Sequence, residues 1–315
     1  RMGYLALCLT YSLAAESRAQ ESAEAIQADQ TFVNRFWQAG SEAARLALSE
    51  ELLMSQPDPA ALFDLFKVGP LYSDQVPLGE HVLARTDSAG TEFPYMINVR
   101  QDYDPQMQWP VEFVLHGGVG RPKAVAGENF WQRSYDRIGQ PGRITVVPLA
   151  WPEAVWWQDE QADNLVAILN SLKSTYNVDE NQVSLTGISD GGTGAYFFAF
   201  KQPTQWASFL PYIGHPGVLR NPQSGGGYRL YFENLMNKPL YIVNGENDRL
   251  YPAASRSSFM DILKDVGVPY TWTVIAEGGH NTEWLKDYLD EVEKFKSSNR
   301  RDPFPIAVQW VADRT

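Results

Sequence analysis

The stretch that decides the fold is Val183-Ser184-Leu185-Thr186-Gly187-Ile188-Ser189-Asp190-Gly191-Gly192. An apolar run that ends in glycine predicts a buried strand, and the residues from Gly192 to Lys201 predict a helix directly after it. A serine at such a strand-to-helix turn, with glycines on both sides, forms the pattern Gly-x-Ser-x-Gly. The turn strains the backbone of Ser189 and exposes its hydroxyl above the sheet edge, where the following helix N-terminus favours negative charge.

Short apolar runs alternate with helical stretches on both sides of this turn. The predicted strands are His81–Arg85, Phe93–Val99, Val111–Leu115, Ile144–Leu149, Val183–Gly187, Ala207–Ile213, Leu240–Val243 and Tyr270–Ile275. The predicted helices are Glu128–Ile138, Asp159–Tyr176, Gly192–Lys201, Ala253–Val266 and Thr282–Lys296. This alternation predicts an α/β fold with a mostly parallel, eight-stranded sheet that helices cover on both faces.

The composition narrows the class of protein and its partners. The chain has 315 residues, 44% of them hydrophobic and 20% charged, which excludes disordered, collagen-like and coiled-coil proteins. Asp and Glu number 38 against 26 Lys and Arg, and this net charge of −12 disfavours nucleic acid or an anionic membrane as the main partner. A single cysteine, Cys8, excludes an internal disulfide and a thiolate metal cluster.

The N-terminus has the features of a signal peptide. The apolar stretch from Tyr4 to Ala15 is too short to span a membrane but has the length of a signal-peptide h-region. Ser17 and Ala19 provide small residues at the −3 and −1 positions of a cleavage site. We therefore predict a signal peptide over residues 1–19 and a secreted or periplasmic protein without a membrane span. The alternative is an N-terminal helix buried against the domain.

Residues 20–77 predict a helical extension packed on the main domain. Apolar residues recur at three- and four-residue spacings from Glu21 to about Lys67. Pro57 and Pro59 break this run, and a short second helix is expected over Ala60–Phe66.

The main domain is predicted over residues 78–298, and residues 299–315 form a tail. The tail has the pattern of a linker that enters a new strand. Because the chain begins at Arg1 and stops soon after this linker, we expect it to be a partial reading frame or a trimmed chain.

Three motifs outside the serine turn complete a candidate site. The strand Val111–Leu115 ends in His116-Gly117-Gly118, a turn whose N–H groups can face a substrate oxygen together with the N–H of Asp190. The alternative is a plain glycine turn after a buried strand.

A carboxylate and a histidine follow two later strands. Asp248 lies in the loop after Leu240–Val243, with Glu246 as the competing carboxylate. Of the four histidines, His280 is the one that follows the last strand, in a glycine-rich turn. The chain order Ser189, Asp248, His280 is that of the α/β hydrolases and differs from the other serine-hydrolase orders.

With these motifs, the chain resembles the α/β-hydrolase superfamily over about Leu78 to Lys296. Within it, the pattern is most similar to secreted serine esterases of the polyhydroxyalkanoate-depolymerase, feruloyl-esterase and esterase D group. It also resembles the catalytic domain of prolyl-oligopeptidase-type peptidases, although it has no β-propeller. Dienelactone hydrolases differ at the nucleophile, because they use a cysteine where this chain has Ser189.

The resemblance implies acyl transfer from an ester to water. His280 acts as general base on Ser189, and Asp248 fixes the imidazole tautomer. The N–H groups of Gly118 and Asp190 bind the oxyanion, and neither a metal nor an organic cofactor is needed. The expected partner is a small-molecule or polymer-derived ester. Two alternatives stay open: a serine peptidase of the prolyl-oligopeptidase type, and a non-catalytic binding protein with a hydrolase fold.

Aromatic residues near the predicted site are candidates for binding substrate. Trp156 and Trp157 follow a strand end, where loops line the crevice of such sheets, and could cradle an aromatic acyl group or a sugar. Trp284 and Tyr251 are further candidates, as is His215. The alternative is that the tryptophans pack the loop against the N-terminal helices and that Trp284 belongs to the core of the last helix.

Overall fold

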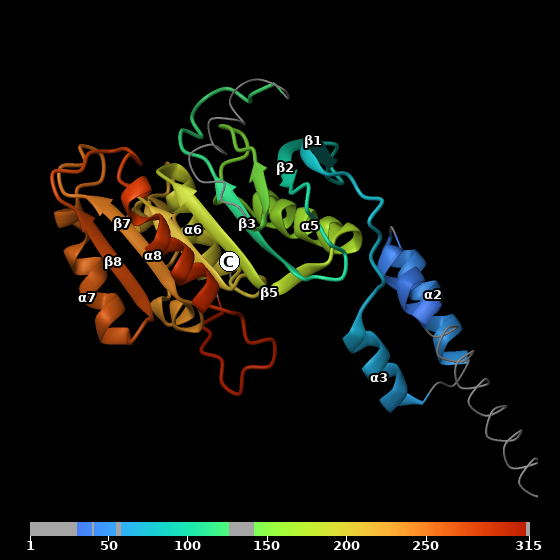
Figure 1. Ribbon diagram of the computed structural model, residues 1–315. Helices are drawn as coiled ribbons and strands as arrows, with labels where there is room; N and C mark the ends of the chain where they lie inside the picture. The colour runs from blue at the N-terminus through green and yellow to red at the C-terminus, as the bar shows by residue number, and fades with distance from the viewer. Residues whose placement is uncertain (1–29, 40, 55–57, 126–141, 313–315) are drawn as a thin grey trace, which may run out of the picture. The chain divides into compact units, whose positions relative to one another are not determined.

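The computed structural model describes residues 30–39, 41–54, 58–125 and 142–312 (Figure 1). The chain divides into two compact units, Arg1–Ser73 and Asp74–Thr315, and each is described by itself. The predicted signal peptide and the predicted helix Glu128–Ile138 lie outside the described residues, so both stay predictions. No helix among the described residues combines the length and the apolarity needed to cross a bilayer.

The second unit is built on one 8-stranded sheet with the order β1-β2-β4-β3-β5-β6-β7-β8. The strands are β1 (Gly79–Thr86), β2 (Glu92–Val99), β3 (Trp109–Leu115), β4 (Ile144–Pro148), β5 (Val178–Ile188), β6 (Ser208–Tyr212), β7 (Leu240–Gly245) and β8 (Tyr270–Ile275). Strand β2 runs antiparallel to both of its neighbours, and all the other pairs are parallel. The predicted mostly parallel sheet is confirmed, and each predicted strand has a counterpart.

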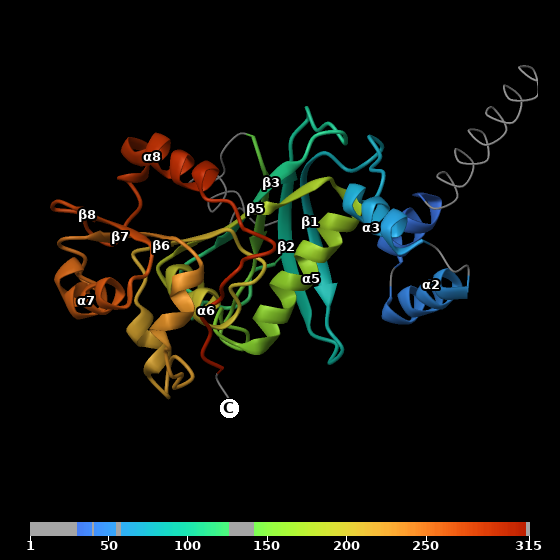
Figure 2. The same ribbon diagram turned by 90° about the horizontal axis from the view of Figure 1, so that it is seen from below.

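Helices cover both faces of this sheet because its central strands are apolar on both sides. In β3, Val111, Phe113 and Leu115 pack into one core, and Val114 packs into the other. Figure 2 shows α5 (Asp159–Thr175), α6 (Asp190–Lys201) and α7 (Ser257–Val266) on one face and α8 (Leu285–Ser298) on the other. The described short 3-10 helices are η1 (Pro216–Arg220), η2 (Phe232–Asn237) and η3 (Ala253–Arg256).

The first unit is helical, as predicted, but its helical run has an additional break. A helix over residues 30–38 ends before α2 (Glu42–Met54), and α3 (Pro59–Val68) follows. The Ser41 hydroxyl accepts a hydrogen bond from Ala44 N at 3.2 Å, so a serine cap starts α2 as a separate helix. The break at the prolines was predicted, and there Asp58 caps α3 in the same way.

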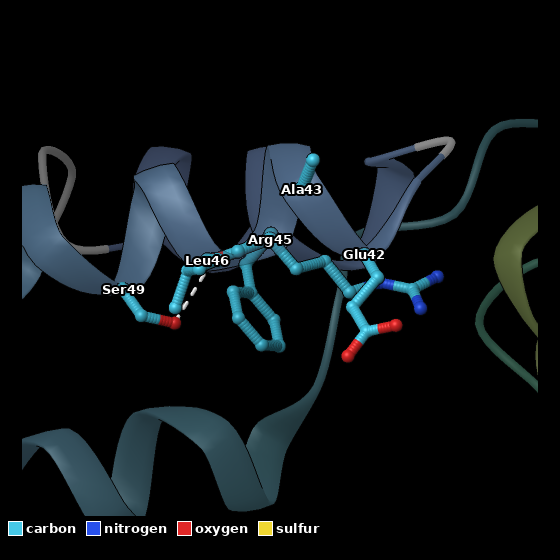
Figure 3. A pocket seen from close by; sticks show the side chains of 6 residues that line it. Glu42, Ala43, Arg45, Leu46 and Ser49 are labelled. Carbon is cyan, nitrogen blue, oxygen red and sulfur yellow. Dashed lines mark hydrogen bonds between the residues drawn. The ribbon is translucent and has the colours of Figure 1, made fainter.

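A hollow of about 510 Å³ lies along α2 (Figure 3). It is lined by Phe36, Glu42, Ala43, Arg45, Leu46 and Ser49. Glu42 and Arg45 are both exposed, and so is Leu46. The hollow is therefore part of a solvated helix face and carries no arrangement suited to catalysis.

The tail does not form the predicted strand within the described residues. Instead, amide side chains of η2 hold its backbone in place. Val311 N donates to Asn234 Oδ1 at 2.7 Å, and Asn234 Nδ2 donates back to Val311 O at 3.1 Å. Asn237 holds Gln309 in the same two-way manner. Side-chain amides thus take the place of the neighbouring strand that a β-ladder needs.

A buried ion pair joins the sheet to α8. Glu112 of β3 is fully buried, and its Oε1 lies 2.6 Å from Lys296 Nζ of α8. Thr186 Oγ1 of β5 donates to the same oxygen at 2.6 Å. Burial acts to raise the pKa of Glu112, but Lys296 and Arg143 outweigh burial and hold this pKa below its ordinary value. The carboxylate is therefore charged and paired. Lys296 also contacts Glu293 at 3.2 Å, so Glu112 is the fully buried one of its two countercharges.

We expect Glu112→Gln to lower the free energy of unfolding by about 3–5 kcal/mol, because it removes the fully buried one of the two carboxylates that pair with the Lys296 ammonium, the other being Glu293 at 3.2 Å. Urea unfolding followed by tryptophan fluorescence measures this loss. Asp290→Asn, an exposed acidic position on α8, is the matched control and should change stability by less than about 0.5 kcal/mol. A double variant, Glu112→Gln with Lys296→Met, should recover part of the loss. A loss below about 1 kcal/mol for Glu112→Gln would contradict this account.

Candidate active site

Ser189 occupies the turn between β5 and α6 in a strained backbone conformation. Its φ of 55° and ψ of −115° are rarely adopted by residues other than glycine. The turn is held on both sides, since Ser189 N donates to Tyr212 O of β6 and Thr193 N donates to Ser189 O, each at 2.9 Å. Neighbouring elements therefore fix the direction of the serine side chain.

Two glycines let the chain pass through this turn. A Cβ added to Gly187 would lie 1.9 Å from Gly191 O, and one added to Gly191 would lie 2.0 Å from Leu115 O. No side chain fits at either position. The glycines of the motif are therefore required because β3, β5 and α6 approach one another here at backbone contact.

The structure brings Ser189, His280 and Asp248 together in one hydrogen-bonded line. His280 Nε2 lies 2.8 Å from Ser189 Oγ, and His280 Nδ1 lies 2.8 Å from Asp248 Oδ2. The three residues follow β5, β7 and β8, whose carboxyl ends meet at one edge of the parallel sheet. With Asp248 as a carboxylate, the proton of His280 lies on Nδ1, and Nε2 is free to accept the serine proton.

The carboxylate of Asp248 is buried and fully hydrogen-bonded. Its Oδ1 accepts from Leu250 N at 2.8 Å and from Tyr251 N at 3.0 Å, so the carboxylate is fixed in orientation. The competing carboxylate, Glu246, accepts instead from Glu277 N at 2.9 Å. Asp248, and not Glu246, is thus the carboxylate that meets His280.

The His116 ring links the glycine turn after β3 to the loop after β4 by hydrogen bonds. Its Nε2 accepts from Ala150 N at 3.0 Å, and its Nδ1 donates to Gly117 O at 2.9 Å, which fixes the neutral tautomer. Burial lowers the pKa of His116 to about 4. Trp156 Nε1 donates to His116 O at 2.9 Å. This role of His116 was not predicted from the sequence, although a histidine directly before two glycines at a strand end is a signal for it.

The predicted oxyanion donor Gly118 is already engaged. Its N–H donates to Asp190 Oδ2 at 2.9 Å, and Val119 N donates to the same oxygen at 3.0 Å. The Gly118 N–H that was predicted to bind the oxyanion thus donates to the carboxylate of the residue after the serine in this structure. Gly117 is the loop residue beside the serine: a Cβ added there would lie 2.9 Å from Ser189 Cβ.

The backbone N–H of Asp190 agrees better with the predicted role. Asp190 is the first residue of α6, and a residue there has no intrahelical acceptor for its N–H. It directly follows Ser189, as an oxyanion donor at this kind of turn does.

The three tryptophans named as substrate-binding candidates are all buried, which agrees with the alternative that they pack within the protein. Trp156 is 0% exposed, and Trp157 and Trp284 are each 6% exposed. Each indole N–H is satisfied internally: Trp157 Nε1 donates to Ser224 O and Trp284 Nε1 donates to Asn281 O, both at 3.0 Å, and Trp156 bonds to the His116 carbonyl. These side chains support the loops of the site from within the core.

Tyr251 is the substrate-binding candidate that the structure does place beside the triad. Its ring centroid lies 5.7 Å from that of His280, edge to face, and 5.4 Å from that of His215. Burial lowers the pKa of His215 to about 4, with a further contribution from Arg256. His215 is therefore neutral at neutral pH. Its Nδ1 accepts from Gly217 N at 2.9 Å, so it caps η1.

No group of three His, Cys, Asp or Glu side chains that could hold a metal ion occurs in the described part of the chain. The sheet, the strained serine turn and the chain order of the triad residues define an α/β hydrolase. Residues 129–293 match the dienelactone hydrolase family, and the chain belongs to that family. No curated protein matches the chain.

Solved structures of similar fold include several esterases. A thermostable esterase is 21% identical with a TM-score of 0.58, over 70% of this chain and 63% of that one. This chain thus spans less than two thirds of that protein's length. The S-formylglutathione hydrolase of Staphylococcus aureus is 16% identical (TM-score 0.52; 70% and 98% covered). An esterase of Thermogutta terrifontis is 13% identical (TM-score 0.56; 70% and 92% covered). At these identities the likeness concerns the fold.

The low pKa of His116 predicts a loss of stability in mild acid. The unfolded chain binds a proton at His116 near its ordinary pKa of 6.5, and the folded chain does so only near 4. Stability is therefore fully present above pH 6.5 and is lost as the pH falls toward 4. Between about pH 7.5 and about pH 5 we expect a loss of about 2 kcal/mol from this residue.

Urea unfolding of the wild type and of His116→Gln at both pH values measures this contribution. His215 titrates in the same direction and remains in both proteins, so the difference between the two isolates His116. Equal pH dependence in wild type and variant would show that His116 is not held neutral by the fold.

Proposed function

We propose that the protein is a serine hydrolase that cleaves carboxylic esters through an acyl-enzyme intermediate. The observation that carries this proposal is the continuous line of hydrogen bonds from Asp248 through His280 to Ser189, with both bonds at 2.8 Å. The serine also stands at a strained turn at the carboxyl edge of the sheet, the position of the nucleophile in a Gly-x-Ser-x-Gly turn.

Each of the three residues has a role in the proposed reaction. Ser189 Oγ attacks the ester carbonyl carbon while His280 Nε2 takes its proton. Asp248 stabilises the imidazolium, and its own orientation is fixed by the N–H groups of Leu250 and Tyr251. His280 then gives the proton to the leaving alcohol. A water molecule repeats the attack on the acyl-enzyme, which releases the acid and restores Ser189.

The oxyanion that forms in each attack needs hydrogen-bond donors on two sides. The proposed donor on the nucleophile side is the backbone N–H of Asp190 at the start of α6. The Gly118 and Val119 N–H groups of the neighbouring loop donate to the Asp190 carboxylate. One such donor is worth about 2.7–4 kcal/mol in the transition state. Backbone donors on a fixed turn cost little reorganisation when the charge develops.

The substrate class rests on the family and on the chemistry of the nucleophile. The dienelactone hydrolase family is named for a cyclic ester, and the similar structures named above include esterases. Ester cleavage requires no more than the acyl transfer that this geometry provides. A peptidase would use the same steps on an amide, whose amine is a poorer leaving group. The triad alone therefore does not distinguish an esterase from a peptidase, and only the substrates cleaved do.

We expect Ser189→Ala to lower kcat/KM for p-nitrophenyl butyrate by about 10³-fold or more, because it removes the nucleophile. Asp248→Asn should lower it by about 10²- to 10⁴-fold, because it removes the carboxylate that fixes the tautomer of His280. Ser174→Ala, at an exposed serine on α5, is the matched control and should keep full activity. Covalent labelling by a fluorophosphonate should require Ser189.

A panel of esters and aminoacyl amides separates the alternatives. Cleavage of the amides without cleavage of the aryl esters would favour a peptidase. Full esterase activity in Ser189→Ala would refute the proposed mechanism. Binding of esters without turnover by the wild type would indicate a binding protein.

A further inference from the structure

We propose that the side chain of Asp190 is a positioning group that ties the loop Gly117–Val119 to the nucleophile turn and so fixes the backbone around the Asp190 N–H, the proposed oxyanion donor. The inference rests on the proposed function and adds to it a role for a side chain that the reaction steps above do not use. Only the backbone N–H of Asp190 takes part in those steps.

The tie consists of two hydrogen bonds to one oxygen. Gly118 N and Val119 N converge on Asp190 Oδ2 at 2.9 and 3.0 Å. Both distances are those of well-formed N–H···O bonds, and bonds to a carboxylate are stronger than those to a neutral acceptor. Two successive amides bound to one oxygen fix both the position and the orientation of this short segment.

The loop needs these hydrogen bonds because its glycine backbone can adopt many conformations. Gly118 has a φ of 73°, and neither Gly117 nor Gly118 has a side chain that could pack. His116 holds the loop from behind through Ala150 and Gly117. The Asp190 carboxylate bonds to the N–H groups of Gly118 and Val119. The loop is therefore held by both His116 and Asp190.

The position of Asp190 suits a charged acceptor. It is the first residue of α6, where the helix dipole stabilises negative charge. The same residue thus supplies a backbone N–H on the nucleophile side and a carboxylate on the loop side. Because both belong to one rigid turn, the loop and the proposed oxyanion donor are coupled within a single residue.

The opposite reading of this contact is that the carboxylate blocks the oxyanion site. A carboxylate oxygen that accepts two amide N–H bonds resembles a bound oxyanion, and substrate would then have to displace it. The two readings predict effects of opposite sign. If the Asp190 carboxylate positions the loop, removing it lowers the activity. If the carboxylate blocks the oxyanion site, removing it raises the activity.

The test compares Asp190→Asn, Asp190→Ala and Asp190→Glu in the full chain with p-nitrophenyl butyrate. Asparagine keeps a neutral oxygen at the same place, so we expect kcat within about threefold of the wild type. Alanine removes the acceptor, and we expect kcat to fall by about 10- to 100-fold, within the range for impaired oxyanion binding, with KM changed by less than about threefold. Glutamate keeps the charge but displaces the oxygen, and it should resemble alanine.

A second measurement avoids dependence on turnover. The rate of Ser189 phosphonylation by a fluorophosphonate should fall in parallel with kcat, because the phosphonyl oxygen uses the same donors. Asp159→Ala removes the acidic first residue of α5, is exposed, and controls for the general effect of an acid at a helix start. It should leave kcat and labelling unchanged.

Several results would overturn the inference. Higher activity in Asp190→Ala would show a block, and unchanged activity would show that the contact is incidental. An Asp190→Asn variant as impaired as alanine, or a fully active Asp190→Glu, would show that charge and not position matters. If alanine does not fold, the asparagine and glutamate variants decide the question. Full esterase activity in Ser189→Ala would instead refute the proposed function and leave these kinetics unrelated to a serine mechanism.

Discussion

The structure depends on one strained residue, Ser189, whose positive φ must be maintained by its surroundings. Such a conformation costs about 1–3 kcal/mol and persists only where neighbouring elements impose it. Here the turn is bonded to β6 through Tyr212 and to its own helix through Thr193. The glycines at 187 and 191 allow β3, β5 and α6 to meet at backbone contact. The packing of the parallel sheet against α6 therefore maintains the unfavourable backbone conformation of Ser189.

Around this turn, the loops at the carboxyl edge are organised by carboxylates that accept from backbone amides. Asp248 accepts from Leu250 and Tyr251, Glu246 from Glu277, and Asp190 from Gly118 and Val119. Backbone amides in loops lack ladder partners, so a side-chain acceptor satisfies them and fixes the loop at the same time. Some of the acidic residues that give the chain its negative charge thus fix the loops at this edge of the sheet.

The sequence predicted the sheet and the chain order of the candidate triad well, because these depend on local periodicity and on motifs at strand ends. It could not predict which way the side chains of the intervening loops point. Trp156 follows a strand end, a position that suits either a substrate wall or the core. Its contact with the His116 carbonyl, 40 residues earlier, decides for the core. The Asp190 carboxylate likewise finds its partners about 70 residues away, and no local pattern reports such contacts.

In the proposed mechanism the nucleophile is a serine, Ser189. A cysteine can react as a thiolate at accessible pH, whereas a serine hydroxyl needs an adjacent general base to become nucleophilic. A serine at this position therefore makes stricter demands on the loops after β7 and β8, which must place His280 and Asp248 in line. The 2.8 Å contacts on both sides of the imidazole meet that demand. In the proposed mechanism, the carboxylates that fix these loops serve the same requirement, because a general base displaced by about 1 Å no longer removes the serine proton efficiently.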